Sequence, residues 1–222
     1  MKLKVISFDL DGTLIDQRFV EAIWFEGLPS LYAKLHHIHF DEAKNFISKE
    51  YDKIGNERLE WYDIKYWFRK FLGHENWLEL FESMKSRIDI YPEAPKVLKE
   101  LEDAGYSLVI ASNSGRAFLD FELEQTGIQH YFKHVFSSTS DFNVVKKEVN
   151  FYMKICKLLN ISPREVAHVG DNWKFDFEVP RRLGIKAFYL DRSRKQSGEF
   201  TLHNLEALNG IIRKTANENS QG

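Results

Sequence analysis

Short hydrophobic runs, each bounded by glycine or polar residues, recur along the chain. They lie at Lys4 to Phe8, Ser107 to Ala111, His134 to Phe136, Val166 to Val169 and Lys186 to Leu190. Continuous apolar runs of this length suit strands that are buried on both faces of a parallel sheet. Between them, residues at helical spacing end at typical helix stops, which are Gly105, Gly127, Asn160 and Gly184. The alternation predicts an α/β fold with a doubly wound parallel sheet.

Residues 17 to 89 interrupt this rhythm. They show helical spacing, as in Trp61, Ile64 and Phe68, and no convincing strand. We therefore expect a sheet domain made of residues 1–16 and 90–215, a helical insert at 17–89 after the first strand, and a flexible tail at 216–222. Four of the five tryptophans fall in the insert, where they suit a compact core, although one or two of them could line a substrate cavity.

Composition narrows the choice of partners. The 222 residues include 31 Lys+Arg against 33 Asp+Glu, a net charge of -2, which provides no broad basic field for nucleic acid or an acidic membrane. No segment approaches the roughly 18 apolar residues of a membrane helix. Cys156 is the only cysteine, which excludes an internal disulfide and favours a reducing compartment. We expect a cytoplasmic monomer or homodimer that binds neither nucleic acid nor membranes.

Two aspartates follow the first predicted strand. Asp9 and Asp11 are spaced i and i+2, so their side chains project to the same side at the edge of the sheet where ligands bind. Clustered carboxylates repel one another unless a cation lies between them, and a hard ion such as Mg²⁺ prefers oxygen ligands. An Asp-Gly turn without a metal would leave the same two residues at this place.

Further polar residues follow other strands. Gly170 and Asp171 end the fourth run, with Asp176 five residues later, and offer the additional carboxylates that a metal requires. Ser112 and Asn113 end the second run before a helix, where hydroxyl and backbone N–H groups suit a phosphate. Lys146 stands just before another predicted helix, where it could equally belong to a solvated charge pair.

The order of these motifs resembles the haloacid dehalogenase superfamily, whose members are mostly Mg²⁺-dependent phosphatases. The resemblance spans essentially the whole chain and implies a Rossmann-like core with a helical cap of the C1 type. Many relatives carry Lys-Pro where this chain carries Lys146 and Lys147. Counting back from the segment Leu159 to Pro163 favours Lys146 as the catalytic lysine.

The resemblance also implies a role for each site residue. Asp9 is the nucleophile that forms an aspartyl-phosphate, and Asp11 is the general acid and base. Mg²⁺ is held by Asp9, the backbone carbonyl of Asp11, and Asp171. The phosphoryl oxygens are held by Ser112, Asn113 and Lys146. Asp176 supports the metal's waters or orients the lysine, and the substrate is a small phosphorylated metabolite.

Two other functions are compatible with the scaffold. A 2-haloacid dehalogenase would use the same nucleophile to attack carbon, but enzymes of that type typically lack the second aspartate, which is present here as Asp11. A non-enzymatic phospho-acceptor resembling a receiver domain would be about half this length and would lack the helical insert. The insert is where capped members of the superfamily set specificity, and Arg18 and Trp24 are the residues we can name there.

Overall fold

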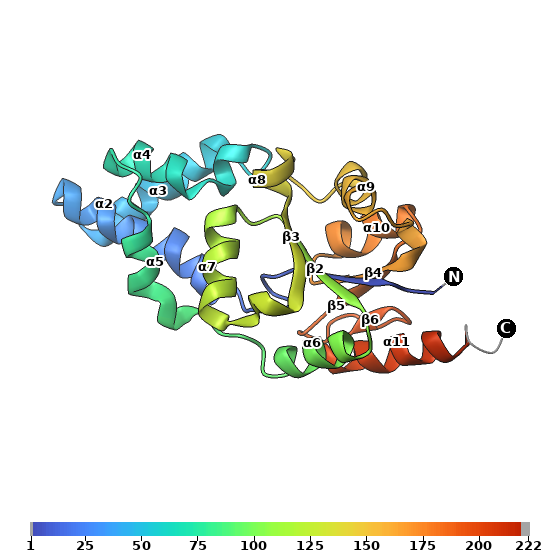
Figure 1. Ribbon diagram of the computed structural model, residues 1–222. Coiled ribbons are helices and arrows are strands. Elements are labelled where there is room, and N and C mark those ends of the chain that lie inside the picture. The colour runs from blue at the N-terminus through green and yellow to red at the C-terminus, as the bar shows by residue number, and fades with distance from the viewer. Residues whose placement is uncertain (1, 219–222) are drawn as a thin grey trace.

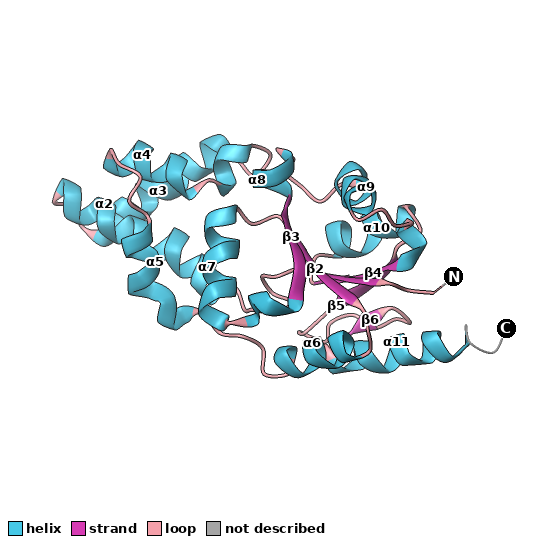
Figure 2. Ribbon diagram, viewed as in Figure 1, coloured by secondary structure: helices cyan, strands magenta, loops and turns pink. Residues whose placement is uncertain are grey.

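The computed structural model describes residues 2–218. Its sheet has six parallel strands in the order β3-β2-β1-β4-β5-β6 (Figure 2). The strands are β1 (Val5–Phe8), β2 (Ser107–Ser112), β3 (Phe132–Ser137), β4 (Val166–Gly170), β5 (Lys186–Leu190) and β6 (Thr201–Leu202). The predicted α/β class is confirmed, and β1 lies inside the sheet between β2 and β4.

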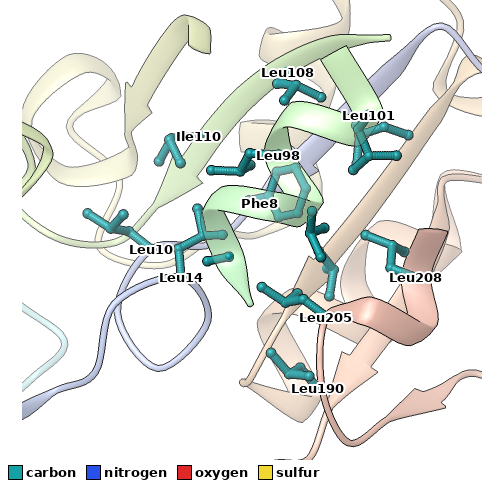
Figure 3. Packing of buried hydrophobic residues seen from close by; sticks show 14 of the residues in the cluster. Phe8, Leu10, Leu14, Leu98, Leu101, Leu108, Ile110, Leu190, Leu205 and Leu208 are labelled. Atoms are coloured by element: carbon teal, nitrogen blue, oxygen red, sulfur yellow. The ribbon is translucent and has the colours of Figure 1, made fainter. Parts of the chain in front are cut away.

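Helices cover both faces of the sheet, because successive side chains of each strand point to opposite faces. Ile6 and Phe8 of β1 pack with α6 (Ala94–Asp103) and α11 (Glu206–Glu218), and Figure 3 shows Phe8 among the leucines of this layer. Val5 faces the other way, toward α9 (Val149–Leu158) and α10 (Val179–Arg182). The four residues of β1 are all buried, as the uninterrupted apolar run predicts.

The predicted helix stops are also present. Gly105, Gly127, Asn160 and Gly184 all have positive φ angles, and each follows a helix closely. Of the predicted tail, 216–218 form the end of α11, and 219–222 lie outside the described residues. No helix among residues 2–218 is long and apolar enough to cross a membrane.

All the regular elements between β1 and α6 are helical. The α-helices are α1 (Arg18–Ala22), α2 (Leu28–His36), α3 (Phe40–Ile54), α4 (Ile64–Leu72) and α5 (Leu78–Met84). A π-helical turn, Ile23–Gly27, joins α1 to α2, and a short 3-10 turn, Leu59–Tyr62, precedes α4. Figure 1 shows this group of helices to one side of the sheet.

Helix α7 (Arg116–Thr126) connects the helical group to the sheet. Its Leu119 and Leu123 belong to the core beneath the sheet. Its Phe118 and Phe121 pack instead into the aromatic core of the helical group, which contains Trp67. The division into two domains therefore stays a prediction, since one helix contributes to both cores.

The two connections into the helical group run side by side. The Asp16 N–H donates to the Asp89 carbonyl at 2.9 Å, and the Tyr91 N–H donates to the Leu14 carbonyl at 3.0 Å. Ile15 and Ile90 form an antiparallel bridge between these two bonds. The chain thus leaves and re-enters the sheet layer at one place, next to the end of β1.

Candidate active site

The turn after β1 carries the aspartate pair to the edge of the sheet. The Asp9 N–H donates to the Val169 carbonyl of β4 at 2.9 Å, which extends the pairing of the two strands by one residue. Gly12 follows with φ 79°, and a Cβ atom at this position would lie 2.2 Å from the Asp171 carboxylate. Only glycine allows both this left-handed turn and this close approach, so the turn brings Asp9 and Asp171 together.

Three carboxylates meet at this edge. Oxygen atoms of Asp9, Asp171 and Asp176 all lie within 4.8 Å of one another. Asp171 directly follows β4, and Asp176 lies in a π-helical turn, Trp173–Glu178, a distortion often found at functional sites. A Cβ atom at Gly170 would lie 2.4 Å from the Asp176 carboxyl carbon, so the strand can end here only with glycine.

The electrostatics of this cluster favour a bound cation. Burial, and then repulsion from Asp176, raises the pKa of Asp171 to about 6. Burial also raises the pKa of Asp9 well above its usual value, although Lys147 partly offsets this effect. Hard oxygen ligands are the set that Mg²⁺ and Ca²⁺ prefer, and a cation would lower the pKa of these carboxyls. The three carboxylates therefore fit a metal ion.

The buried lysine of the site is Lys147. Its ammonium Nζ lies 2.7 Å from Asp9 Oδ1 and 2.5 Å from Asp176 Oδ1, and its side chain is 2% exposed. Nζ also donates to the Ala111 carbonyl at 3.3 Å. Burial would lower the pKa of Lys147, but Asp176 and Asp9 raise it above its ordinary value, so this residue is a fixed cation.

The choice of Lys146 as the site lysine is therefore corrected. Lys146 forms an ion pair with Glu57, in the segment between α3 and α4, whose side chain is 74% exposed. The two lysines stand in a non-helical segment before α9, where consecutive side chains point to different sides of the backbone. Counting residues from a downstream motif cannot decide which of two neighbours points inward.

Asp176 is held in place from several directions. His168 Nε2 lies 3.0 Å from Asp176 Oδ1, and the Asn172 N–H donates to Oδ2 at 3.0 Å. His168 is itself fully buried and contacts the hydroxyl groups of Ser7 and Tyr152. Burial alone would raise the pKa of Asp176, but Lys147 and then His168 lower it to about 2. Asp176, the predicted supporting residue, thus contacts a lysine. That lysine is Lys147, whereas the sequence predicted its neighbour Lys146.

The Asp11 carboxylate lies outside the group of three carboxylates. Its Oδ2 accepts a hydrogen bond from the Ser114 hydroxyl, and the carboxyl group of Glu122 is its other polar neighbour. Burial raises the pKa of Asp11. The predicted metal contact of Asp11 was through its backbone carbonyl, and that contact stays a prediction.

Glu122 of α7 is a neighbour of Asp11 that the sequence analysis missed. It is fully buried, and its carboxyl group lies within hydrogen-bonding reach of the Asp11 carboxyl group, so a proton on either one would join the two. Burial, and then the proximity of Asp11, raises its pKa well above the usual value. The sequence could have indicated Glu122, because it stands four residues after Phe118 and three after Leu119. This spacing places an acid on the apolar face of the helix.

Ser112 is the last residue of β2, as predicted, and Asn113 begins the loop that leads to α7. The Ser112 hydroxyl accepts from the Ser114 N–H at 3.1 Å, and the Asn113 side-chain oxygen accepts from the Ser138 hydroxyl at 2.9 Å. Gly115 then approaches the helical group closely, since a Cβ atom there would lie 2.8 Å from the Tyr62 carbonyl. Contact of Ser112 and Asn113 with a phosphoryl group stays a prediction.

Comparison with known proteins agrees with this geometry. The family model described as haloacid dehalogenase-like hydrolase matches residues 3–184. The glyceraldehyde 3-phosphate phosphatase of Methanocaldococcus jannaschii is 26% identical over 95% of this chain and 97% of its own length. The phosphoglycolate phosphatase of Vibrio vulnificus is 26% identical over 85% of this chain and 84% of its own.

Solved structures share the fold. A HAD phosphatase from Thermococcus onnurineus superposes with a TM-score of 0.80 at 24% identity, covering 95% of this chain and 98% of that one. A 2-haloacid dehalogenase from Pseudomonas syringae gives a TM-score of 0.71 at 18% identity, covering 96% and 100%. These identities show a common fold, so the two chemistries must be separated by the residues of the site.

Proposed function

The chain belongs to the haloacid dehalogenase-like hydrolases, and from this we propose that it is a Mg²⁺-dependent phosphatase of small phosphorylated metabolites. The observation that carries the proposal is the pairing of an acidic cluster with a separate, protonatable Asp11 at the same strand end. The curated relatives described above are named as phosphatases. For the setting, we propose the cytoplasm, with the protein a monomer or homodimer.

Charge compensation is the main requirement of the reaction. A phosphate monoester is an anion, so an anionic nucleophile can approach only if cations offset the repulsion. Asp9, the backbone carbonyl of Asp11, and Asp171 would hold Mg²⁺, with Asp176 supporting them, and the metal would supply positive charge at the phosphoryl oxygens. Lys147 adds a second, permanent cation 2.7 Å from Asp9, and Ser112 and Asn113 would bind the phosphoryl oxygens.

The chain's own residues then carry two steps. In the first, a carboxylate oxygen of Asp9 bonds to phosphorus while the bond to the leaving oxygen breaks and Asp11 donates a proton to that oxygen. In the second, Asp11 accepts a proton from water as the water oxygen bonds to phosphorus, which releases phosphate and restores the Asp9 carboxylate. Burial, which raises the pKa of Asp11, suits it to hold the first proton.

Asp11 also distinguishes this reaction from dehalogenation. Halide leaves carbon as a stable anion and needs no proton, whereas an alkoxide leaving group does. The test is release of phosphate from a generic aryl phosphate with Mg²⁺ and with excess chelator. We expect turnover only with the metal. Faster release of halide from 2-chloropropionate than of phosphate from any ester would replace the proposal with a dehalogenase.

A further inference from the structure

An aromatic cavity opens beside the proposed site. It measures about 240 Å³ and lies between the helical group, α7 and the loop after β2. Six aromatic side chains line it, namely Trp24, Phe25, Tyr51, Trp61, Tyr62 and Phe118. Trp24 and Phe25 come from the π-helical turn Ile23–Gly27. Such turns are often found at functional sites, and this one directs two aromatic residues toward the same space.

The cavity is continuous with the catalytic loop. Asn113 and Ser114 also line it, and the Ser114 hydroxyl donates to the Asp11 carboxylate. Asp11 is the proposed proton donor to the leaving oxygen, so whatever group is attached to that oxygen starts next to Ser114. The cavity is therefore placed to receive the leaving group of the ester.

The lining carries no charge that could bind an ionic leaving group. Among the described residues, those around the cavity include no Lys, Arg, His, Asp or Glu. The two tyrosine hydroxyls are already committed, because Tyr51 donates to the Trp24 carbonyl at 3.1 Å and Tyr62 donates to the Asn56 carbonyl at 3.2 Å. A carboxylate or phosphate held against these walls loses part of its hydration without gaining a cationic partner, which costs free energy. The cavity thus selects against charged leaving groups.

Size and shape favour a ring. An apolar cavity of roughly 150 Å³ can hold benzene, and this one is larger, at about 240 Å³. Aromatic walls also favour aromatic guests, through edge-to-face and offset contacts. The walls already contact each other in this way: Trp24 and Tyr51 are 5.9 Å apart at 90°, and Phe25 and Tyr51 are 6.4 Å apart at 80°.

We infer that the preferred substrates are phosphate monoesters whose leaving group carries an uncharged aromatic ring that occupies this cavity. The inference rests on the proposed phosphatase activity and narrows its substrate class. It disfavours phosphoglycolate and pyrophosphate, because the leaving group of each is itself an anion.

A matched pair of esters tests the inference. Benzyl phosphate and 4-carboxybenzyl phosphate differ by one carboxylate, far from the bond that breaks. With Mg²⁺ present, we expect kcat/KM to be at least about 10-fold lower for the carboxylated ester. Val20 also lines the cavity, and a Val20→Lys variant should narrow or reverse this ratio by supplying the missing cation.

A second pair of variants separates the cavity from general effects on the fold. Phe25 and Phe46 are 43% and 41% exposed, and both lie in the helical group, but Phe46 stacks on Tyr32 away from the cavity. Phe25→Ala should raise KM for benzyl phosphate roughly 3- to 10-fold and leave methyl phosphate, which is too small to fill the cavity, unchanged. Phe46→Ala should change neither.

The outcomes separate the two proposals. Equal kcat/KM for the two benzyl esters, or a loss in Phe25→Ala that methyl phosphate shares, would overturn the cavity assignment while the phosphatase stands. If no ester is hydrolysed with Mg²⁺, the phosphatase proposal fails, and calorimetric binding of benzylphosphonate against 4-carboxybenzylphosphonate decides the cavity assignment. Tighter binding of benzylphosphonate, whose ring carries no charge, supports it, and equal binding refutes it.

Discussion

Replacing Lys147 with methionine removes the cation between Asp9 and Asp176 and keeps a side chain of similar length. The ammonium lies 2.7 and 2.5 Å from oxygens of these two buried carboxylates. Removing one partner of a buried ion pair costs about 3–5 kcal/mol, because the remaining charge stays desolvated. We expect the free energy of unfolding of Lys147→Met to fall by about that amount, measured by urea denaturation in the presence of Mg²⁺.

The effect on catalysis should be equally large. Lys147 is the permanent cation nearest to the proposed nucleophile, and removing one electrostatic contact of this kind typically lowers kcat by about 10²- to 10³-fold. Phosphate release from an aryl phosphate at saturating Mg²⁺ measures the loss. Circular dichroism of the same sample shows whether the variant is folded, because a loss of about 3–5 kcal/mol is a large share of the roughly 5–15 kcal/mol of stability of a typical domain.

Lys146→Met is the matched control, because it makes the same chemical change one residue away. Lys146 pairs with Glu57, whose side chain is 74% exposed, and exposed ion pairs contribute about 0–1 kcal/mol. We expect its stability and its turnover to stay close to those of the unmodified protein. A large loss of turnover in Lys146→Met with activity retained in Lys147→Met would refute the reasoning and restore the lysine chosen from the sequence.

Three further predictions concern the turn after β1 and the acidic cluster. Asp11→Asn should lower phosphate release by about 10²- to 10⁴-fold while Mg²⁺ still raises the Tm; unaltered turnover would remove Asp11 from the acid role. In excess chelator, burial and Asp176 raise the pKa of Asp171 from 3.8 to about 6. The protonated Asp171 carboxyl therefore contributes its full stability below about pH 4, and this contribution is lost as the pH rises through about 6. Mg²⁺ should therefore raise the Tm more at pH 7 than at pH 5, and an equal rise at both would contradict this. Arg192 donates to the carbonyls of Gly12 at 3.3 Å and Thr13 at 2.6 Å, so Arg192→Met should cost about 2–3 kcal/mol in urea denaturation and lower kcat; unchanged values of both would show that it does not secure the turn.

The sheet could be predicted because its strands are buried on both faces. The run Lys186 to Leu190 coincides with β5, and the first run differs from β1 by one residue. The sixth strand, Thr201–Leu202, has two residues and no apolar run of its own. It pairs with β5 because the later chain folds back alongside that strand. The local sequence pattern carries no information about this long-range pairing.

The site was predicted as far as strand ends determine it. Asp9 and Asp171 follow adjacent strands, so the parallel order alone brings them together. The direction in which a side chain points could not be predicted in the same way. Lys147 is buried because both of its acidic partners, more than 25 residues away in the chain, lie on that side of the segment. Glu122 could have been found from its place on an apolar helix face, but its approach to Asp11 depends on how α7 docks.

The interior position of β1 bears on when the site can form during synthesis. Val5–Phe8 is made first, yet its neighbours are Ser107–Ile110 and Val166–Val169. At about 5–20 residues per second, the second neighbour leaves the ribosome roughly 8–30 s after the first strand. Asp9 gains its bond to the Val169 carbonyl only then. A nascent chain halted before β4 therefore has its helical group complete but no acidic cluster.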